Sequence, residues 1–293
     1  MRHATFRQLR VFDAIARHGS FSRAAEEMSL TQPTLSMQVK KISDSVGLPL
    51  FEQVGKKVYL TEAGRALHRM CREVFDSIDH FEMTLDDIKG VKRGSLRIAA
   101  VTTAEYFLPR LLGPFCNAYP GIAVTLELIQ RDRVLDRLRN NHDDLYVFGQ
   151  PPQDPEVVTR PFLANPLVVV APAGHPLAGQ GRQSLERVMQ EPFLMRETGS
   201  GTRNAMERFF EDRGLHPRLR MELGSNEAIK QGVMGGLGLA VMSRHAIHGI
   251  SELVELDVED FPILKQWYLV WPAGRQVSVA AQALLDHLSP QED

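Results

Sequence analysis

The sequence contains little cysteine, no long apolar run and almost no net charge. Two cysteines, Cys71 and Cys116, are too few for a disulfide framework in a chain of 293 residues, which favours a reducing compartment. No stretch of about 20 apolar residues is present to span a bilayer, and charged residues interrupt the first ten positions before a signal peptide could form. These absences argue against a disulfide-stapled secreted protein and a membrane partner, and predict a cytoplasmic protein.

Motifs typical of enzymes are also missing. The sequence has no G-x-S-x-G elbow and no P-loop, and Gly236-Leu-Gly238 precedes a predicted strand, whereas a dinucleotide-binding fingerprint follows one. His245 and His248 could share a helix face, but no third ligand for a metal lies near them in the sequence. We therefore expect no catalytic residues, no metal, no cofactor and no enzymatic activity.

The near-neutral charge is the sum of two oppositely charged parts. Residues 1–93 hold 15 Lys and Arg against 12 Asp and Glu, whereas residues 94–293 hold 19 against 24. Between them, Gly90 and Gly94 punctuate a polar stretch where a helical pattern gives way to a strand-like one. The length fits about two domains, so we expect a small basic module followed by a larger acidic one.

Apolar spacing predicts three helices in the first module. Thr5 can cap the first, which Gly19 ends; Ser20 can cap the second and Thr31 the third, with only three residues forming the turn between them. Two helices joined so tightly are a helix-turn-helix candidate. The third helix is expected to bury one apolar stripe: Leu35, Val39, Ile42 and Val46.

The opposite side of the third helix suits DNA. Gln can pair bidentately with adenine and Ser can bond several bases, so Gln32 and Ser36 are candidate base readers. Lys40, further along, can neutralise a phosphate without reading sequence. Residues 50–60 alternate around a glycine-centred turn, as a β-hairpin wing does. The alternative is a structural three-helix module whose lysines are merely solvated.

Four runs in this module resemble LysR-type transcriptional regulators: residues 9–28 (LRVFDAIARHGSFSRAAEEM), 31–40 (TQPTLSMQVK), 50–52 (LFE) and 60–64 (LTEAG). The resemblance implies a winged helix-turn-helix over residues 1–61. The DNA-contacting residues that it and the pattern indicate are Thr31, Gln32, Pro33, Thr34, Ser36, Met37, Lys40, Gln53, Lys56 and Lys57. Met37 and Gln53 stand where the family often carries Arg, which weakens phosphate or guanine contacts there.

A long helix is predicted from Glu62 to about Lys89, within a linker of residues 62–93. Apolar residues recur at alternating spacings of four and three over three heptads, which favours pairing with a second helix over packing on its own domain. The expected dimerisation seam is Leu67, Cys71, Val74, Ile78, Phe81, Leu85 and Ile88. LysR-type proteins dimerise through this element, so the resemblance agrees with the periodicity.

Predicted strands and helices alternate after residue 94, which indicates α/β lobes built on mostly parallel sheets. The expected strands span residues 95–101, 123–129, 144–149, 167–171, 193–196, 219–223, 239–242 and 266–271, and the helices 104–119, 133–140, 202–213, 227–234 and 278–288. We assign residues 94–165 and 265–293 to lobe I and residues 166–264 to lobe II. Ligands in such folds bind at the carboxyl ends of strands, where helix N-termini offer amides to anions.

Three predicted helix starts carry hydroxyl or amide side chains near Arg or Lys, which suits a small anion. The alternative is plain helix capping with surface Arg. The arrangement resembles the periplasmic-binding-protein-like effector domain of LysR-type regulators, and in particular the regulators of Calvin-cycle (RuBisCO operon) genes. The expected effector-binding residues are Thr102, Thr103, Gln150, Arg196, Thr198, Gly199, Ser200, Gly201, Thr202, Arg203, Asn226 and Lys230.

The sequence thus predicts a LysR-type activator of carbon-fixation genes that binds double-stranded promoter DNA and itself, as a dimer or tetramer. The resemblance implies a phosphorylated metabolite or nucleotide as effector, and admits RNA polymerase as a further partner. The alternatives are a LysR-type regulator of another operon, and an enzyme or solute-binding α/β protein whose first module only docks a partner.

Overall fold

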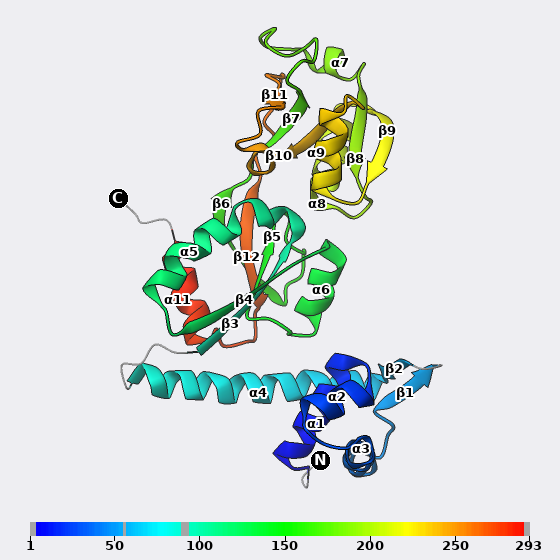
Figure 1. Cartoon of the computed structure of the whole chain (residues 1–293), viewed down its shortest axis with the longest axis vertical. Coiled ribbons are helices and arrows are strands. Elements are labelled where there is room, and N and C mark those ends of the chain that lie inside the picture. The colour runs from blue at the N-terminus through cyan, green and yellow to red at the C-terminus, as the bar shows by residue number, and fades with distance from the viewer. Residues whose placement is uncertain (1–3, 55–56, 89–93, 290–293) are drawn as a thin grey trace. The chain divides into compact units, whose positions relative to one another are not determined.

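A computed structural model describes residues 4–54, 57–88 and 94–289 of the chain (Figure 1). The chain divides into two compact units: Met1–Leu85 with Asn140–His142, and Asp86–Arg139 with Asp143–Asp293. No helix among the described residues is both long enough and apolar enough to cross a membrane.

The first unit is a helix-turn-helix with a wing. Its elements are α1 (Phe6–His18), α2 (Phe21–Glu27), α3 (Gln32–Val46), the antiparallel pair β1 (Phe51–Val54) and β2 (Lys57–Leu60), and α4 (Glu62–Ile88). Thr5, Ser20 and Thr31 cap the three helices, as the sequence predicts, and Thr5 also forms a reciprocal capping box with Gln8. Leu35 and Val39 of α3 pack against the apolar faces of α1 and α2, so the helices share one core.

The start of α4 is fastened to the segment that precedes the wing. Thr61 caps α4 by accepting from the Gly64 amide at 3.0 Å, while its hydroxyl donates to the Pro49 carbonyl at 2.7 Å. A Cβ on Gly64 would lie 2.0 Å from the Leu50 carbonyl oxygen, so only glycine allows this approach. The wing and the long helix are therefore joined rigidly.

A buried hydrogen bond also fixes α4 to α1. Asp13 accepts from Arg17 at 2.9 Å and lies 3.1 Å from Nε2 of His68 on α4. Burial alone would raise the pKa of Asp13, but hydrogen bonds to His68 and Arg17 outweigh it and hold the pKa below its usual value. The α1–α4 junction thus keeps a charged carboxylate inside the first unit.

Lobe I of the second unit is a five-stranded sheet in the order β4-β3-β5-β12-β6. The strands are β3 (Gly94–Val101), β4 (Ile122–Ile129), β5 (Leu145–Phe148), β6 (Val157–Ala164) and β12 (Gln266–Pro272). The helical segments are the 3-10 helix η1 (Thr102–Tyr106), α5 (Leu108–Ala118), α6 (Arg131–Arg139) and α11 (Val279–His287). Val134 and Leu138 of α6 pack on one face of the sheet against Ala99, Tyr146 and Phe148.

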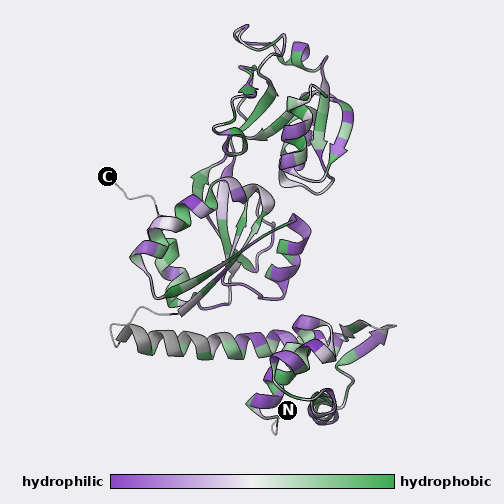
Figure 2. Cartoon of the chain, viewed as in Figure 1, coloured by the Kyte–Doolittle hydropathy of each residue, from purple (hydrophilic) through white to green (hydrophobic). Residues whose placement is uncertain are grey.

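Lobe II repeats the design with the strand order β11-β7-β10-β8-β9. Its strands are β7 (Leu167–Pro172), β8 (Pro192–Arg196), β9 (Arg218–Leu223), β10 (Leu239–Ser243) and β11 (Leu253–Glu255). Its helices are α7 (Leu185–Val188), α8 (Gly201–Glu211), α9 (Asn226–Met234) and α10 (Arg244–Ile247). Alternate residues of β8 face opposite sides: Phe193 packs in the core under α8, and Leu194 in the core under α9. Most strands of both sheets are largely apolar, whereas β9 alternates charged and apolar residues and α6 is largely polar (Figure 2).

Two chain crossings connect the lobes and run beside each other. The Asn165 amide donates to the Lys265 carbonyl at 2.8 Å, and Leu167 and Ile263 exchange both backbone hydrogen bonds at 2.9 Å. Paired segments of this kind let the lobes move as bodies about a shared strip.

The predicted fold class is confirmed, with corrections of detail. The sheets are mixed, because β12 pairs antiparallel with β5 and β6, and β7 pairs antiparallel with β10 and β11. The expected helix over residues 104–119 begins as η1 and continues as α5, since a proline follows Leu108. The sequence analysis missed four elements: β6, α7, α10 and β11.

Candidate functional site

The third helix presents its N-terminal half to solvent. Gln32, Pro33, Ser36, Met37 and Lys40 are exposed, whereas the opposite stripe of Leu35, Val39 and Ile42 is buried and Val46 is half-buried. Thr31 caps the helix and Thr34, half-buried, shares a 2.8 Å hydrogen bond with the Thr31 hydroxyl. A helix that shows its first turns to solvent beside a second, shorter helix has the geometry of a major-groove reader.

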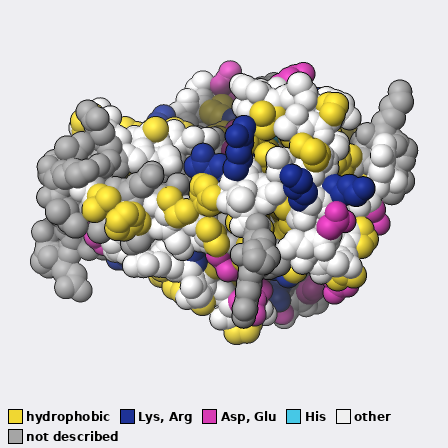
Figure 3. All heavy atoms as spheres, turned by 90° about the horizontal axis from the view of Figure 1, so that it is seen from below, with side chains coloured by type: hydrophobic (Ala, Val, Ile, Leu, Met, Phe, Trp, Pro, Cys, Tyr) yellow, Lys and Arg dark blue, Asp and Glu magenta, His cyan; other side chains and the backbone are white. Residues whose placement is uncertain are grey.

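The wing carries three of the predicted DNA-contacting residues, Gln53, Lys56 and Lys57. Gln53 is exposed on β1, and Lys57 begins β2. Lys56 lies outside the described residues. On the face of the molecule drawn in Figure 3, Lys and Arg side chains are interspersed with polar and apolar ones instead of forming a uniformly basic surface.

The predicted dimerisation seam on α4 divides into two parts. Leu67 and Cys71 are buried in the core of the first unit, so for these two the alternative of packing on the helix's own domain holds. Burial raises the pKa of the Cys71 thiol to about 12, which makes it an inert apolar side chain. Further along, Val74, Ile78 and Leu85 are half-buried and Phe81 is 60% exposed. The Ile88 side chain lies outside the description.

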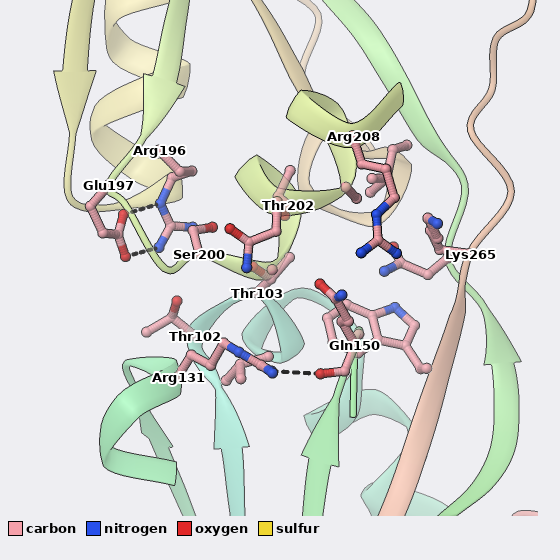
Figure 4. A pocket seen from close by; sticks show the side chains of 18 residues that line it. Thr102, Thr103, Arg131, Gln150, Arg196, Glu197, Ser200, Thr202, Arg208 and Lys265 are labelled. Atoms are coloured by element: carbon pink, nitrogen blue, oxygen red, sulfur yellow. Dashed lines mark hydrogen bonds and ion pairs between the residues drawn. The ribbon is translucent and has the colours of Figure 1, made fainter. Parts of the chain in front are cut away.

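In the second unit a cavity of about 90 Å³ opens between the two lobes (Figure 4). This space holds several water molecules and suits a small metabolite. It is lined by Val101, Thr102, Thr103, Arg131, Gly149, Gln150, Asn165, Leu167, Arg196, Glu197, Ser200, Gly201, Thr202, Asn204, Ala205, Arg208, Lys265 and Trp267. As expected for α/β sheets, the lining gathers at the carboxyl ends of β3 and β8.

The N-terminus of α8 opens into this cavity. Ser200 stands at the N-cap position but makes no capping hydrogen bond, and Ser200, Gly201 and Thr202 all line the cavity. The preceding residue, Gly199, has a φ of +90°, which glycine adopts without strain and which turns the chain from β8 into α8. A helix start whose amides are not used by its own cap is ready to bind an anion.

The N-terminus of α9 is built differently. Ser225 caps its own helix by accepting from the Ala228 amide at 3.1 Å. Asn226 is 4% exposed and makes two side-chain hydrogen bonds: its amide donates across the lobes to the Thr103 hydroxyl at 2.8 Å, and its carbonyl accepts from Arg196 of its own lobe at 2.6 Å. At the start of α9, therefore, the serine caps the helix and the asparagine packs between the lobes, as the alternative to anion binding expects.

Four cations and one carboxylate line the cavity. Arg196 is buried and pairs bidentately with Glu197, while Arg131, at the start of α6, donates to the Gln150 carbonyl at 2.5 Å. Burial lowers the pKa of Arg131, which means its charge is poorly solvated. Its position in the first turn adds to the positive end of the helix dipole instead of offsetting it.

The other two cations come from opposite lobes. Arg208 lies on α8 and Lys265 on the crossing before β12, and both project toward the cavity (Figure 4). Within the described residues neither of them forms an ion pair, and Arg131 forms none either. Gln150 Oε1 and Trp267 Nε1 are buried beside the cavity and have no hydrogen-bond partner in the described part of the chain. The site therefore offers positive charge and unused hydrogen-bonding groups, which suit an anion with further polar groups.

Seven of the twelve predicted effector residues line the cavity: Thr102, Thr103, Gln150, Arg196, Ser200, Gly201 and Thr202. The others lie outside its lining. Thr198 is exposed, Arg203 pairs with Glu207 and Glu222, and Lys230 pairs with Glu227 and stacks on Tyr106. Gly199 forms the turn into α8, and Asn226 hydrogen-bonds to the lining residues Thr103 and Arg196.

The sequence analysis missed the charged residues Arg131, Glu197, Arg208 and Lys265. Starting the predicted helix at residue 133 instead of 131 moved Arg131 into a loop, although only Gln130 separates it from the preceding strand. Arg208 could have been found from helical spacing, because positions 201, 204, 205 and 208 share one face of α8. No sequence signal marks Lys265, because only the return of the chain from lobe II brings it to the cavity.

A winged helix-turn-helix in the same chain as a two-lobed, anion-receptive domain defines a class: transcriptional regulators that carry their own ligand sensor. Two family models match accordingly. The model for the bacterial regulatory helix-turn-helix protein of the lysR family covers residues 6–65, and the LysR substrate binding domain model covers residues 89–292. The chain belongs to the LysR family of transcriptional regulators, as the resemblance implies.

Individual relatives place it more narrowly. The chain is 48% identical to the HTH-type transcriptional activator CmpR of Synechocystis over 100% of this chain and 97% of the relative. It is 50% identical to a RuBisCO operon transcriptional regulator of Allochromatium vinosum, over 96% of this chain and 94% of that protein. These full-length matches to regulators do not favour the alternative of a solute-binding protein.

Solved structures agree. The regulatory domain of Synechocystis CcmR in complex with 2-PG matches with a TM-score of 0.64 and 47% identity, over 67% of this chain and 96% of that domain. A full-length OxyR variant from Pseudomonas aeruginosa matches with a TM-score of 0.79 and 24% identity, over 98% of this chain and 95% of the other, which shows a shared fold.

Proposed function

We propose that this protein activates carbon-fixation genes in the cytoplasm when a small phosphorylated anion binds between its lobes. Relatives that are 47% and 50% identical are named RuBisCO operon regulators, and the related CcmR domain carries 2-PG, which is 2-phosphoglycolate. The observation that carries the proposal is the open N-terminus of α8, which shares the cavity with Arg131, Arg208 and Lys265, three cations that pair with no carboxylate among the described residues. We use 2-phosphoglycolate as the first probe because it joins a phosphate to a carboxylate.

The proposed mechanism couples lobe position to DNA binding. A ligand shifts an equilibrium only if it binds one arrangement better than the other. An anion held by Thr102 and Thr103 of lobe I and Ser200 and Thr202 of lobe II favours the arrangement in which both sets reach it. We propose that this preference re-angles the α4 helices of a dimer and hence their DNA modules at the promoter, where RNA polymerase is the further partner.

Effector binding is tested by calorimetry on the full-length chain. We expect 2-phosphoglycolate to bind at one site per chain, and Thr202→Ala to weaken it roughly tenfold because a hydrogen bond to a charged ligand is lost. Thr198→Ala is the matched control, since Thr198 is exposed nearby but does not line the cavity. No heat with the unaltered chain, or equal losses in both variants, would contradict the assignment of this site.

DNA reading is tested by electrophoretic shifts with the promoter region and a scrambled duplex. We expect Gln32→Ala or Ser36→Ala to reduce the ratio of specific to scrambled affinity by about tenfold, because each exposed side chain reads a base edge. Lys40→Ala should weaken both duplexes alike and flatten the salt dependence. Equal losses on both duplexes in all three variants would contradict the assignment of Gln32 and Ser36 as base readers.

A further inference from the structure

Arg196 holds a carboxylate inside the cavity. Its Nε donates to Glu197 Oε2 at 2.7 Å and its Nη2 to Glu197 Oε1 at 2.9 Å. A third donor, Nη1, is taken by the Asn226 carbonyl at 2.6 Å. Three of the five guanidinium N–H groups are therefore committed, and the two on the planar edge that suits an oxyanion are both used by Glu197.

Glu197 contrasts with the rest of the lining. It is the single acidic residue among those that line the cavity as described, and it neutralises one cation while Arg131, Arg208 and Lys265 form no ion pair there. Figure 4 shows the Arg196–Glu197 pair on one side of the cavity and Arg208 and Lys265 on the other. The positive charge is therefore neutralised on the Arg196 side of the cavity and is not neutralised by any described residue on the side of Arg208 and Lys265.

The pairing has a physical reason. The Arg196 side chain is 7% exposed, and a buried guanidinium without a partner is strongly unfavourable. The Glu197 side chain is more exposed, at 27%, while its backbone carbonyl is fixed by the Ser200 amide at 3.1 Å. The carboxylate can therefore rotate away from Arg196 without moving the turn into α8.

We propose that Glu197 is a built-in competing anion that sets the charge a ligand needs, which deepens and rests on the proposed function. A monocarboxylate that replaced Glu197 on Arg196 would form the same two hydrogen bonds that Glu197 gives up, so its net binding free energy would be small. A phosphate monoester carries nearly two charges and three acceptor oxygens at neutral pH, so it can displace Glu197 and also bind the α8 amides. The cavity thereby selects dianionic head groups over monoanions.

Calorimetry on the full-length chain at pH 8 tests this with three probes: 2-phosphoglycolate, inorganic phosphate and glycolate, a monocarboxylate. The unaltered chain should bind 2-phosphoglycolate well, phosphate more weakly and glycolate not measurably. Glu197→Gln should bind 2-phosphoglycolate and phosphate about tenfold more tightly and glycolate measurably, since a neutral amide competes less. Glu197→Asp keeps the charge and should keep the discrimination.

The matched control is Glu207→Gln. Glu207 is a carboxylate on α8, the helix that follows Glu197, and it pairs with Arg203 outside the cavity, so its loss should change affinities less than twofold. If Glu197→Gln binds 2-phosphoglycolate no more tightly and still rejects glycolate, Glu197 positions Arg196 and the inference is overturned. If the unaltered chain binds neither phosphorylated probe, the proposed function fails, and the inference with it.

Discussion

Helices α8 and α9 of lobe II both have a serine at the N-cap position, yet the two serines have different roles. At α9, Ser225 caps its own helix, Asn226 is committed to Thr103 and Arg196, and the nearby Lys230 pairs with Glu227. At α8, Ser200 makes no cap, glycine precedes and follows it, and the nearby Arg131 and Arg208 form no ion pair in the described chain. The comparison indicates that a helix start is suited to an anion when no side chain caps its backbone amides and when the cations beside it are not already paired with carboxylates.

The largest expected effect separates the cations at these two starts. Arg131→Ala should weaken 2-phosphoglycolate binding by about 100-fold, because a half-buried guanidinium without a carboxylate partner then no longer faces the ligand. Lys230→Met removes the ammonium that lies over the Tyr106 ring but keeps an apolar side chain of similar length, and should leave the affinity within about threefold. Calorimetry measures both. A larger loss in Lys230→Met than in Arg131→Ala would reverse the comparison.

The next effect is on stability. Asn226→Ala removes the acceptor of a buried arginine and the partner of the Thr103 hydroxyl, which should cost about 2 kcal/mol. Both tryptophans, Trp267 and Trp271, lie on β12, so their fluorescence during denaturant unfolding reports on the second unit. Asn204→Ala, on α8, is the control and should cost less than about 0.5 kcal/mol. Equal costs would show that Asn226 has no special structural role.

The smallest effect concerns the cap itself. Ser225→Ala should lower the free energy of unfolding by about 1 kcal/mol, because the capping hydrogen bond to the Ala228 amide is lost. Ser200→Ala should leave this energy nearly unchanged, since Ser200 caps nothing, but should weaken 2-phosphoglycolate several-fold. The same unfolding and calorimetry assays apply. If Ser200→Ala destabilises and Ser225→Ala does not, the roles assigned to the two serines are exchanged.

Local signals in the sequence predict much of this molecule. The caps at Thr5, Ser20 and Thr31 and the exposed side of α3 follow from short-range patterns, because capping and amphipathic spacing depend on a few neighbouring residues. The helix starts that carry Thr102 and Thr202 could be expected at the cavity, because each follows the carboxyl end of a strand in its own sheet.

The remainder depends on contacts between distant segments. Ser200 and Ser225 look alike in the sequence, and only the folded lobe shows which one caps. Leu67 and Cys71 continue a perfect 4-3 repeat, yet they pack on α1 and the wing, because a periodic face does not specify its partner. Lys265 reaches the cavity only through the second chain crossing, which no local pattern marks.

The central claim is that the N-terminus of α8 binds the phosphate of the effector. A crystal structure of the full-length chain with 2-phosphoglycolate tests it most directly. The account predicts phosphate oxygens within hydrogen-bond distance of the Gly201 and Thr202 amides and the Ser200 hydroxyl, with Arg131 turned toward the ligand. A phosphate bound against Ser225 and Asn226 at the start of α9, or outside the cavity, would contradict it.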